Sequence, residues 1–392
     1  MVEAGAVTGS KASLRFGMVG GGPGAFIGDV HRRAATFDGR AVLVAGSFSS
    51  DHARTVQTGR SLGLPEERLY ASWAEMAKRE AARSDRIDFV SIVTPNNTHY
   101  AIARAFLEQG INVVCDKPLV LEVSEAEELE RLAGSKGLLF CVTYVYTGYP
   151  MVKHARALIK AGEIGELRFV NAEYPQEWLA TPVERTGARG AAWRTDPKQT
   201  GKANCVGDIG SHVENIVSYL TGLRIRRVAA RLDIFVPGRL LDDNATVMLE
   251  YGGGAKGLYW TSQIAWGWDN ALRVRVFGST GSIEWAQEDP NYLRIARQGK
   301  PTEILSRGRD PLAPRAAAAS RIPAGHPEGY YEAFANVYRT FTDALVKKNG
   351  GAALTGEDLD FPDAGAGLDG VRFIDACVES SRHGAAWVNL EA

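Results

Sequence analysis

Three side chains have the types and spacing needed to take a proton from an alcohol and stabilise the oxygen left behind. Lys117 follows a short apolar run, and Asp208 and His212 lie four residues apart in the segment GDIGSH. On a helix, residues four apart share one face, about 40° apart around the axis. An imidazole accepts a hydroxyl proton near neutral pH, an ammonium stabilises the alkoxide, and a carboxylate holds the imidazole or binds a neighbouring hydroxyl.

Each of these residues also has a purely structural interpretation. The Lys117 ammonium could extend into solvent, Asp208 could cap the helix that follows it, and His212 could be a core histidine with satisfied hydrogen bonds. Taken together with a nucleotide-binding segment upstream, the three favour a catalytic role. No His, Cys or Asp cluster has zinc spacing, so we expect no metal and assign the electrophilic role to Lys117.

The nucleotide-binding segment is a glycine-rich turn between a predicted strand and a predicted helix. Residues 20–25 read GGGPGA, which fits the dinucleotide fingerprint with Gly24 next to Ala25 in the third position. Gly20 makes the tight turn, Gly22 lets the backbone approach a pyrophosphate, and the helix N-terminus faces the negative charge. The alternative is a generic strand-to-helix turn, which is disfavoured by its place on the first strand of a βαβ series.

The end of the second predicted strand bears on the choice between NAD and NADP. A carboxylate about 20 residues after the glycines would bind the ribose 2′-hydroxyl and repel a 2′-phosphate. Ser47 and Ser49 occupy that place, Asp51 comes late, and the segment 46–50 contains no Lys or Arg. Serines tolerate either cofactor, so both stay open, with NAD slightly favoured.

The other predicted site residues lie at the carboxyl ends of parallel strands, where open α/β sheets bind ligands, or in segments expected to face them. On the cofactor side they are Phe26, Thr94, Pro95, Asn96, His99, Asp116, Lys117, Trp193 and Arg194. On the substrate side they are Lys117, Asp208 and His212 with Tyr144, Tyr146, Trp178 and His326. Aromatic rings stack on sugar faces, and arginines such as Arg185 and Arg189 favour anionic groups. Ordinary packing is the alternative for Trp193, and a helix start is the alternative for His326.

The elements that must position these residues follow from hydrophobic patterning. Near-continuous apolar runs separated by helices over 14–146 indicate a Rossmann-type, doubly wound parallel sheet. Alternating segments after residue 147 indicate a second α/β domain, 147–392, with a large, open, mostly antiparallel sheet. Residues 1–13 are predicted to be a disordered leader, and 298–328 a long irregular connection followed by two helices.

Length and composition exclude several classes of protein. The chain has 392 residues, 45% of them hydrophobic, and its 45 basic and 46 acidic side chains give a formal net charge of −1. Neither a nucleic-acid partner nor a membrane surface is expected, because both attract strongly basic proteins. No apolar run reaches the roughly 18 residues of a membrane span, and the first residues show no secretory pattern. We therefore expect a cytoplasmic protein that acts on a small molecule.

Eight segments of the sequence together resemble the Gfo/Idh/MocA oxidoreductase family, in order along residues 14–392. They are GMVGGGPGA, TPNNTH, DKP, AGEIGEL, WRTDP, GDIGSH, FGSTGSIEW and LDGVRFIDACVESSRHGAAWV. The resemblance implies a Rossmann domain followed by a domain whose open sheet supports substrate binding and oligomer contacts, with Lys117, Asp208 and His212 at the catalytic positions. Two departures stand out: the Glu usual before the lysine is Asp116, and Thr147-Gly148-Tyr149 replaces an Arg-Phe pair found in many members.

Three functions remain open at this point. The first is NAD(P)-dependent oxidation of a secondary alcohol in a sugar, cyclitol or sugar derivative. The second is an oxidative glycosidase that uses the nicotinamide only transiently, and the third is a non-catalytic sensor of cofactor or sugar. We also expect a homodimer or homotetramer built on the open sheet, with Tyr259, Trp260 and Trp285 facing outward.

Overall fold

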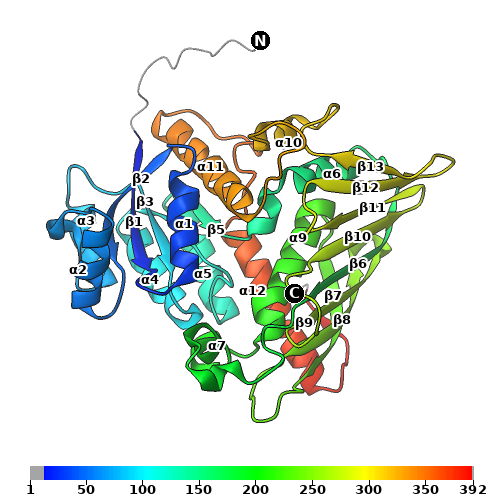
Figure 1. Cartoon of the computed structure of the whole chain (residues 1–392), viewed down its shortest axis with the longest axis horizontal. Helices are drawn as coiled ribbons and strands as arrows, with labels where there is room; N and C mark the ends of the chain where they lie inside the picture. Colours follow the sequence, from blue (N-terminus) through cyan, green and yellow to red (C-terminus); the bar gives the residue numbers. More distant parts are fainter. Residues whose placement is uncertain (1–12, 391–392) are drawn as a thin grey trace.

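The computed structural model describes residues 13–390 and contains two sheets with helices around and between them (Figure 1). The predicted leader 1–13 therefore lies outside the described residues except for Ser13. Within the described residues, no helix is both long and apolar enough to cross a bilayer. The predicted fold class is confirmed, since one sheet is parallel and the other is mostly antiparallel.

The first sheet holds the strand ends that carry the predicted cofactor residues. Its five parallel strands run in the order β2-β1-β3-β4-β5, so the strand order reverses between β1 and β3 and leaves a crevice at the carboxyl ends. The strands are β1 (Leu14–Gly20), β2 (Ala41–Ser47), β3 (Phe89–Val93), β4 (Asn112–Cys115) and β5 (Phe140–Val142). The helices on its faces are α1 (Phe26–Thr36), α2 (His52–Ser61), α3 (Trp73–Ala81), α4 (His99–Glu108) and α5 (Val123–Ser135).

The second sheet has nine strands in the order β13-β12-β11-β10-β6-β9-β8-β7-β14. Strand β6 pairs parallel with β9 and antiparallel with β10. The strands are β6 (Leu167–Pro175), β7 (Ile225–Asp233), β8 (Asn244–Tyr251), β9 (Lys256–Ser262), β10 (Arg273–Gly278), β11 (Gly281–Ala286), β12 (Tyr292–Arg297), β13 (Glu303–Ser306) and β14 (Val388–Asn389). Because β13 pairs with β12, part of the predicted irregular connection 298–328 is a hairpin.

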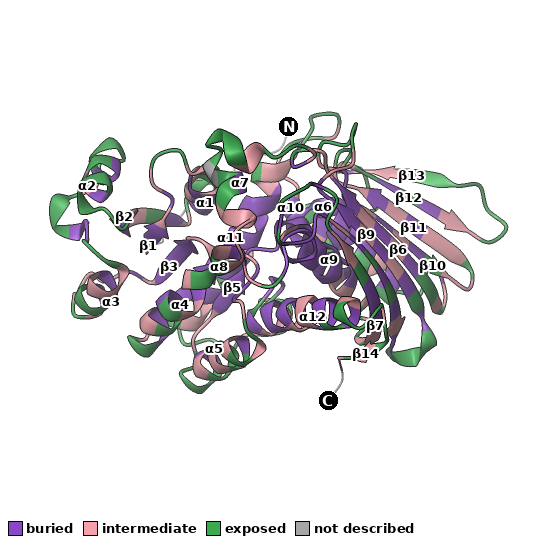
Figure 2. Ribbon diagram, turned by 90° about the horizontal axis from the view of Figure 1, so that it is seen from below, coloured by how far each residue is buried: buried purple, intermediate pink, exposed green. Residues whose placement is uncertain are grey.

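One face of the second sheet is buried and the other is open, as Figure 2 shows by the alternation of buried and exposed residues along the strands. Two helices of the buried layer are α6 (Pro150–Lys160) and α9 (Ser211–Thr221). Tyr259 and Trp285 are each only 1% exposed, so the expectation that they face outward was wrong. Successive strand residues point to opposite faces, so Tyr259 and its neighbour Trp260 cannot both face outward. The open face instead carries apolar residues such as Phe169, Met248 and Phe277.

Two helices near the end of the chain pack against the first sheet's helices. Helix α11 (Tyr330–Asn349) contacts α1, and α12 (Ala364–Arg382) contacts α5. Tyr338 of α11 shares a 2.7 Å hydrogen bond with Nδ1 of His31 in α1 and another of 2.7 Å with Ser91 of β3. Two helices from the end of the chain thus complete the packing around the first sheet.

Candidate active site

Lys117 and Asp208 are joined directly, although 91 residues of sequence separate them. Lys117 directly follows Asp116 at the end of β4, and Asp208 lies in the π-helical turn η5 (Val206–Gly210) that leads into α9. The Lys117 ammonium donates to Asp208 Oδ1 at 2.7 Å and to the Asp208 backbone oxygen at 2.6 Å. Both side chains are 13% exposed. The lysine therefore faces the crevice rather than bulk solvent.

The Asp208 carboxylate is held by side chains. Within residues 13–390, no backbone N–H of the following helix donates a hydrogen bond to it. Its Oδ2 accepts from Nε2 of Gln263 at 3.0 Å and lies 3.3 Å from Nε of Arg194. Burial by itself would raise the pKa of Asp208, but the charges of Lys117 and Arg194 outweigh it and hold the pKa well below its usual range. The residue is therefore a carboxylate, and the simple N-cap interpretation does not apply.

His212 lies on the following turn in an aromatic enclosure. Its ring meets the ring of Tyr146 at a centroid distance of 4.8 Å, that of Tyr144 at 5.6 Å and that of Tyr174 at 6.3 Å. Burial, and then the charge of Lys117, lower the pKa of His212 well below 6.5. Its buried Nδ1 has no hydrogen-bond partner among the described residues, unlike a satisfied core histidine. At neutral pH the imidazole is uncharged and able to accept a proton.

The three tyrosines around His212 are all buried and differ in their hydrogen bonds. Tyr146 shares a short hydrogen bond with Tyr174, whose hydroxyl donates to Oδ1 of Asn270 at 2.7 Å. Tyr144 was expected to contact substrate, but it is 1% exposed and lies against His212 and Gly370. Tyr144 therefore packs against the imidazole, and its contact with substrate stays a prediction.

The glycine turn between β1 and α1 has the shape that a dinucleotide pyrophosphate requires. Gly20 and Gly24 adopt positive φ angles of 86° and 80°, which favour glycine. A Cβ at Gly22 would lie 2.8 Å from the backbone oxygen of Phe48, so any side chain would crowd the cradle. Helix α1 begins at Phe26 with Ala25 as its N-cap, and no side chain caps its first N–H groups. These groups and the turn fit the phosphates of a bound dinucleotide.

Gly28 is a functional glycine that the sequence analysis missed. A Cβ there would lie 2.4 Å from the Cα of Gly21, so Gly28 is what allows α1 to pack closely on the turn. This is the role the fingerprint gives to its third glycine, which we had placed at Ala25. A glycine inside a helix lowers the stability of the helix by about 1 kcal/mol relative to alanine. A glycine in the predicted helix after the turn was therefore the sign, in the sequence, of close packing at this position.

The end of β2 offers no carboxylate to the cofactor crevice. Ser47 is buried, and the Ser49 hydroxyl accepts from the backbone N–H of Asp51 at 3.1 Å. Asp51 caps α2 by accepting from the N–H of Ala53 at 2.9 Å. The first acidic side chain after β2 is thus engaged in capping a helix.

The loops after β3 and β4 are tied together by His99. Its Nδ1 lies 3.0 Å from the Pro118 oxygen and its Nε2 2.9 Å from the Thr94 oxygen, and the residue is fully buried. His99 therefore positions these loops, which corrects the expectation of direct cofactor contact. Asn96, following Pro95, donates to the Thr200 oxygen at 3.4 Å. Asp116 Oδ1 accepts from the Lys117 N–H at 2.8 Å and from the Thr143 hydroxyl at 3.1 Å, which links the ends of β4 and β5.

Arg194 connects the Asp208 carboxylate to two tryptophans. Its guanidinium lies 4.3 Å from the ring of Trp193 and 5.7 Å from that of Trp178. Both tryptophans thus contact a residue that pairs with Asp208, and their roles toward cofactor and substrate stay predictions. Arg185, predicted to favour anions, instead donates to the Pro237 oxygen at 3.2 Å and is exposed.

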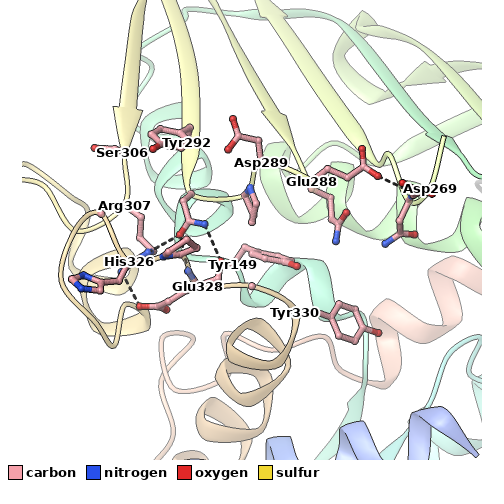
Figure 3. A pocket seen from close by; sticks show the side chains of 17 residues that line it. Tyr149, Asp269, Glu288, Asp289, Tyr292, Ser306, Arg307, His326, Glu328 and Tyr330 are labelled. Atoms are coloured by element: carbon pink, nitrogen blue, oxygen red, sulfur yellow. Dashed lines mark hydrogen bonds and ion pairs between the residues drawn. The ribbon is translucent and has the colours of Figure 1, made fainter. Parts of the chain in front are cut away.

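A cavity of about 890 Å³ opens beyond the tyrosines (Figure 3). It is lined by Tyr149, Asn270 and Tyr330, by the acidic segment 287–292, and by the loop that carries His326. His326 therefore faces the cavity rather than the three catalytic candidates. The buried ion pair of Arg307 and Glu328, at 2.7 Å, was missed because nothing in the local sequence pattern joins the two. Among residues 13–390, no group of three His, Cys, Asp or Glu side chains has a metal-binding arrangement.

Comparison with known proteins identifies relatives along nearly the whole chain. The model of an oxidoreductase family with an NAD-binding Rossmann fold matches residues 14–144, and that of the GFO/IDH/MocA C-terminal domain matches 152–284. An uncharacterized oxidoreductase, YfiI of Bacillus subtilis (strain 168), is 38% identical over 381 residues, which cover 96% of this chain and 97% of the relative.

Solved structures agree with this similarity. An inositol dehydrogenase homolog from Azotobacter vinelandii complexed with NAD+ is 39% identical, with a TM-score of 0.91 over 96% of this chain and 97% of the other. An inositol dehydrogenase homolog from that organism complexed with NADH and myo-inositol is 40% identical, with a TM-score of 0.89 and the same coverage. The glycine turn, the paired Lys117 and Asp208, and these matches agree with one another: the chain belongs to the Gfo/Idh/MocA family and is an NAD-binding oxidoreductase.

Proposed function

We propose that the protein oxidises a secondary alcohol of a sugar, cyclitol or sugar derivative, with NAD as the hydride acceptor. The observation that carries this proposal is the arrangement of Lys117, Asp208 and His212 beside the crevice of the first sheet. A homolog that has been solved with NADH and myo-inositol supports a polyhydroxylated ring as substrate. When bound, the nicotinamide supplies the acceptor for the hydride that leaves the alcohol carbon.

Each catalytic candidate has a distinct role toward the hydroxyl. His212 is neutral at pH 7 and takes the hydroxyl proton. Lys117 directs its ammonium at the same oxygen and stabilises the negative charge that develops there. Asp208 fixes the Lys117 ammonium by the 2.7 Å hydrogen bond and keeps the local net charge near neutral.

NAD is the preferred cofactor in this proposal. The crevice lacks a carboxylate at the end of β2, so NADP is not repelled there, but the segment 46–50 also supplies no cation for a 2′-phosphate. NAD is also the cofactor bound in the solved homolog. Affinities for the two cofactors, measured side by side by fluorescence titration, decide this point.

Two further proposals concern assembly and location. The exposed apolar residues of the open sheet face, among them Phe169, Met248 and Phe277, favour a homodimer or homotetramer that covers this face. A monomeric mass in solution at micromolar concentration would contradict this assembly. We also propose a cytoplasmic location, with which four free buried cysteines are consistent.

One experiment separates the proposed dehydrogenase from the two other functions. The purified protein is incubated with NAD and a panel of sugars and cyclitols, and absorbance at the NADH wavelength is followed together with product release. A dehydrogenase forms NADH in proportion to oxidised sugar. Release of an aglycone without net NADH identifies an oxidative glycosidase, and binding without either product identifies a sensor.

A further inference from the structure

The large cavity is lined by other residues than the three catalytic candidates. Its volume of about 890 Å³ is near the upper end of the roughly 300–1,000 Å³ typical of ligand pockets. Its lining comes from the loop between β11 and β12, the end of β13, the loop before α11, and single residues such as Asn270 and Tyr149, the latter labelled in Figure 3. None of Lys117, Asp208 and His212 lines it. A ring bound at those three residues would therefore leave this volume unfilled.

The cavity and the catalytic candidates are nevertheless neighbours. Asn270 lines the cavity and accepts a hydrogen bond from the Tyr174 hydroxyl, which is also hydrogen-bonded to the Tyr146 hydroxyl. The Tyr146 ring packs edge-on against His212 at 4.8 Å. Tyr330 also lines the cavity; burial raises its pKa well above the usual value, and the negative charges of Asp116 and Asp208 are near enough to contribute. Tyrosine side chains thus border both the cavity and the catalytic candidates, since Tyr149 lines the cavity and stacks on Tyr146, which contacts His212.

The charge of the lining restricts what the cavity can hold. Four carboxylates line it, namely those of Asp269, Glu288, Asp289 and Glu328, against one guanidinium. That guanidinium, of Arg307, is already engaged by Glu328, by Asn291 at 2.8 Å and by three backbone oxygens.

The lining carboxylates of Asp269, Glu288 and Asp289 can accept further hydrogen bonds. In the described part of the chain, Asp269 and Asp289 form no ion pair and no side-chain hydrogen bond, while Glu288 accepts from the Asn270 N–H at 2.9 Å. Among the lining residues that the structure describes, no lysine or arginine is left to bind an anion. Carboxylate oxygens accept hydrogen bonds from hydroxyl and ammonium groups, and they repel other carboxylates.

We propose that this cavity is a subsite for a second ring of the substrate, one that bears hydroxyl or amino groups and no anionic group. The inference rests on the proposed function, because the first ring is the one oxidised beside Lys117 and His212. The preferred substrates are then glycosides or disaccharides rather than free monosaccharides or cyclitols. Uronic acids in the second ring are excluded.

The test compares matched sugars on the full-length protein saturated with NAD. The pairs are glucose with maltose, glucose with cellobiose, and myo-inositol with a galactosyl inositol; cellobiouronic acid supplies an anionic second ring. Both kcat/KM for NADH formation and Kd from calorimetry are measured. We expect at least one two-ring sugar to have a kcat/KM tenfold higher, or a Kd tenfold lower, than its matched single-ring sugar. We expect cellobiouronic acid to be at least tenfold worse than cellobiose in the same measurement.

The two proposals fail in different ways. If no sugar yields NADH or other product, the proposed function fails, and the calorimetric comparison still decides the subsite. If no two-ring sugar exceeds its single ring in either measurement, the subsite is refuted even where single rings are oxidised rapidly. Equal binding of cellobiose and cellobiouronic acid refutes the charge argument.

Variants of Asp289 connect the effect to the cavity. Asp289→Arg places a large cation in the lining, so the two-ring preference should fall at least fivefold and the discrimination against the uronic acid should reverse. Asp289→Asn keeps the size and should only weaken that discrimination. The matched control is Glu67→Arg, an exposed acid at the far edge of the first sheet that lines no described cavity, and it should change neither ratio. Unchanged ratios in Asp289→Arg would overturn the proposal.

Discussion

Replacing Lys117 by methionine should change both the rate and the pH dependence of the reaction. Methionine keeps much of the side-chain length but loses the donor that lies 2.7 Å from Asp208 Oδ1. Loss of one donor to a developing oxyanion lowers kcat by about 10²–10³, or roughly 3–4 kcal/mol. Breaking a buried ion pair costs roughly 3–5 kcal/mol of stability when a charge is left alone. Arg194 and Gln263 still contact Asp208 here, so we expect the lower end of that range.

The loss of Lys117 should also shift the pH dependence of kcat/KM in a defined direction. Burial lowers the pKa of His212 most, and the positive charge of Lys117 lowers it further. The base form of His212 therefore persists below pH 6.5 in the wild type, and activity should be lost only at lower pH. Without Lys117 one of the two causes disappears, so the acid limb of kcat/KM should move upward, towards but not beyond 6.5. Lys117→Arg keeps the charge and should leave the limb in place.

The assay is kcat/KM against pH for wild type, Lys117→Met and Lys117→Arg, with NAD affinity and unfolding temperature as controls. NAD affinity should stay within a few-fold, since the pyrophosphate cradle lies at the glycine turn. An acid limb that moves downward in Lys117→Met, or a rate within threefold of wild type, would refute the assignment of Lys117.

Further predictions concern the cofactor turn, the base and a buried acid. Gly22→Asp places a Cβ 2.8 Å from the Phe48 oxygen and adds a negative charge, so NAD binding should vanish in a fluorescence titration while the circular dichroism spectrum stays native. His212→Ala should lower kcat/KM by about 10²–10⁴, and its combination with Lys117→Met should lose far less than the product of the single losses; strictly multiplicative losses would separate the two residues. Ser47→Asp should weaken NADP binding much more than NAD binding, and equal effects would place position 47 away from the ribose. Burial raises the pKa of Glu214 to about 8, so between about pH 5 and 8 the folded state keeps a proton that the unfolded state releases. The free energy of unfolding should therefore fall as the pH rises through this range, and denaturant titrations of Glu214→Gln should show no such fall.

The sequence predicted the catalytic candidates because their positions follow from local rules. Lys117 comes at a strand end, and residues 208 and 212 share a helical face, so the topology of a parallel sheet brings them to one crevice. The aromatic enclosure of His212 was less accessible. Whether Tyr144 lies behind the imidazole or beside the substrate depends on how β5 and α9 pack, and a single sequence does not encode that in any short pattern.

The wrong predictions for the second sheet have a similar origin. The outward face of β9 depends on the strand register, and a shift of one residue exchanges Tyr259 with Trp260. The strands β12 and β13 flank a turn rich in glycine and proline, and these residues led us to extend the irregular connection over β13. The ion pair of Arg307 with Glu328 joins a strand end to a distant loop, which only the folded chain brings together.

The packing of α11 on α1 has a consequence for how the chain is made. Residues 14–144, which match a family model by themselves, leave the ribosome long before residues 330–382 are synthesised. Until then the α1 surface around His31 and the β3 residues Phe89 and Ser91 lack Tyr338, their partner in the finished protein. The nucleotide-binding half therefore completes its core only at the end of synthesis, and a fragment ending near residue 146 should be insoluble or only partly folded.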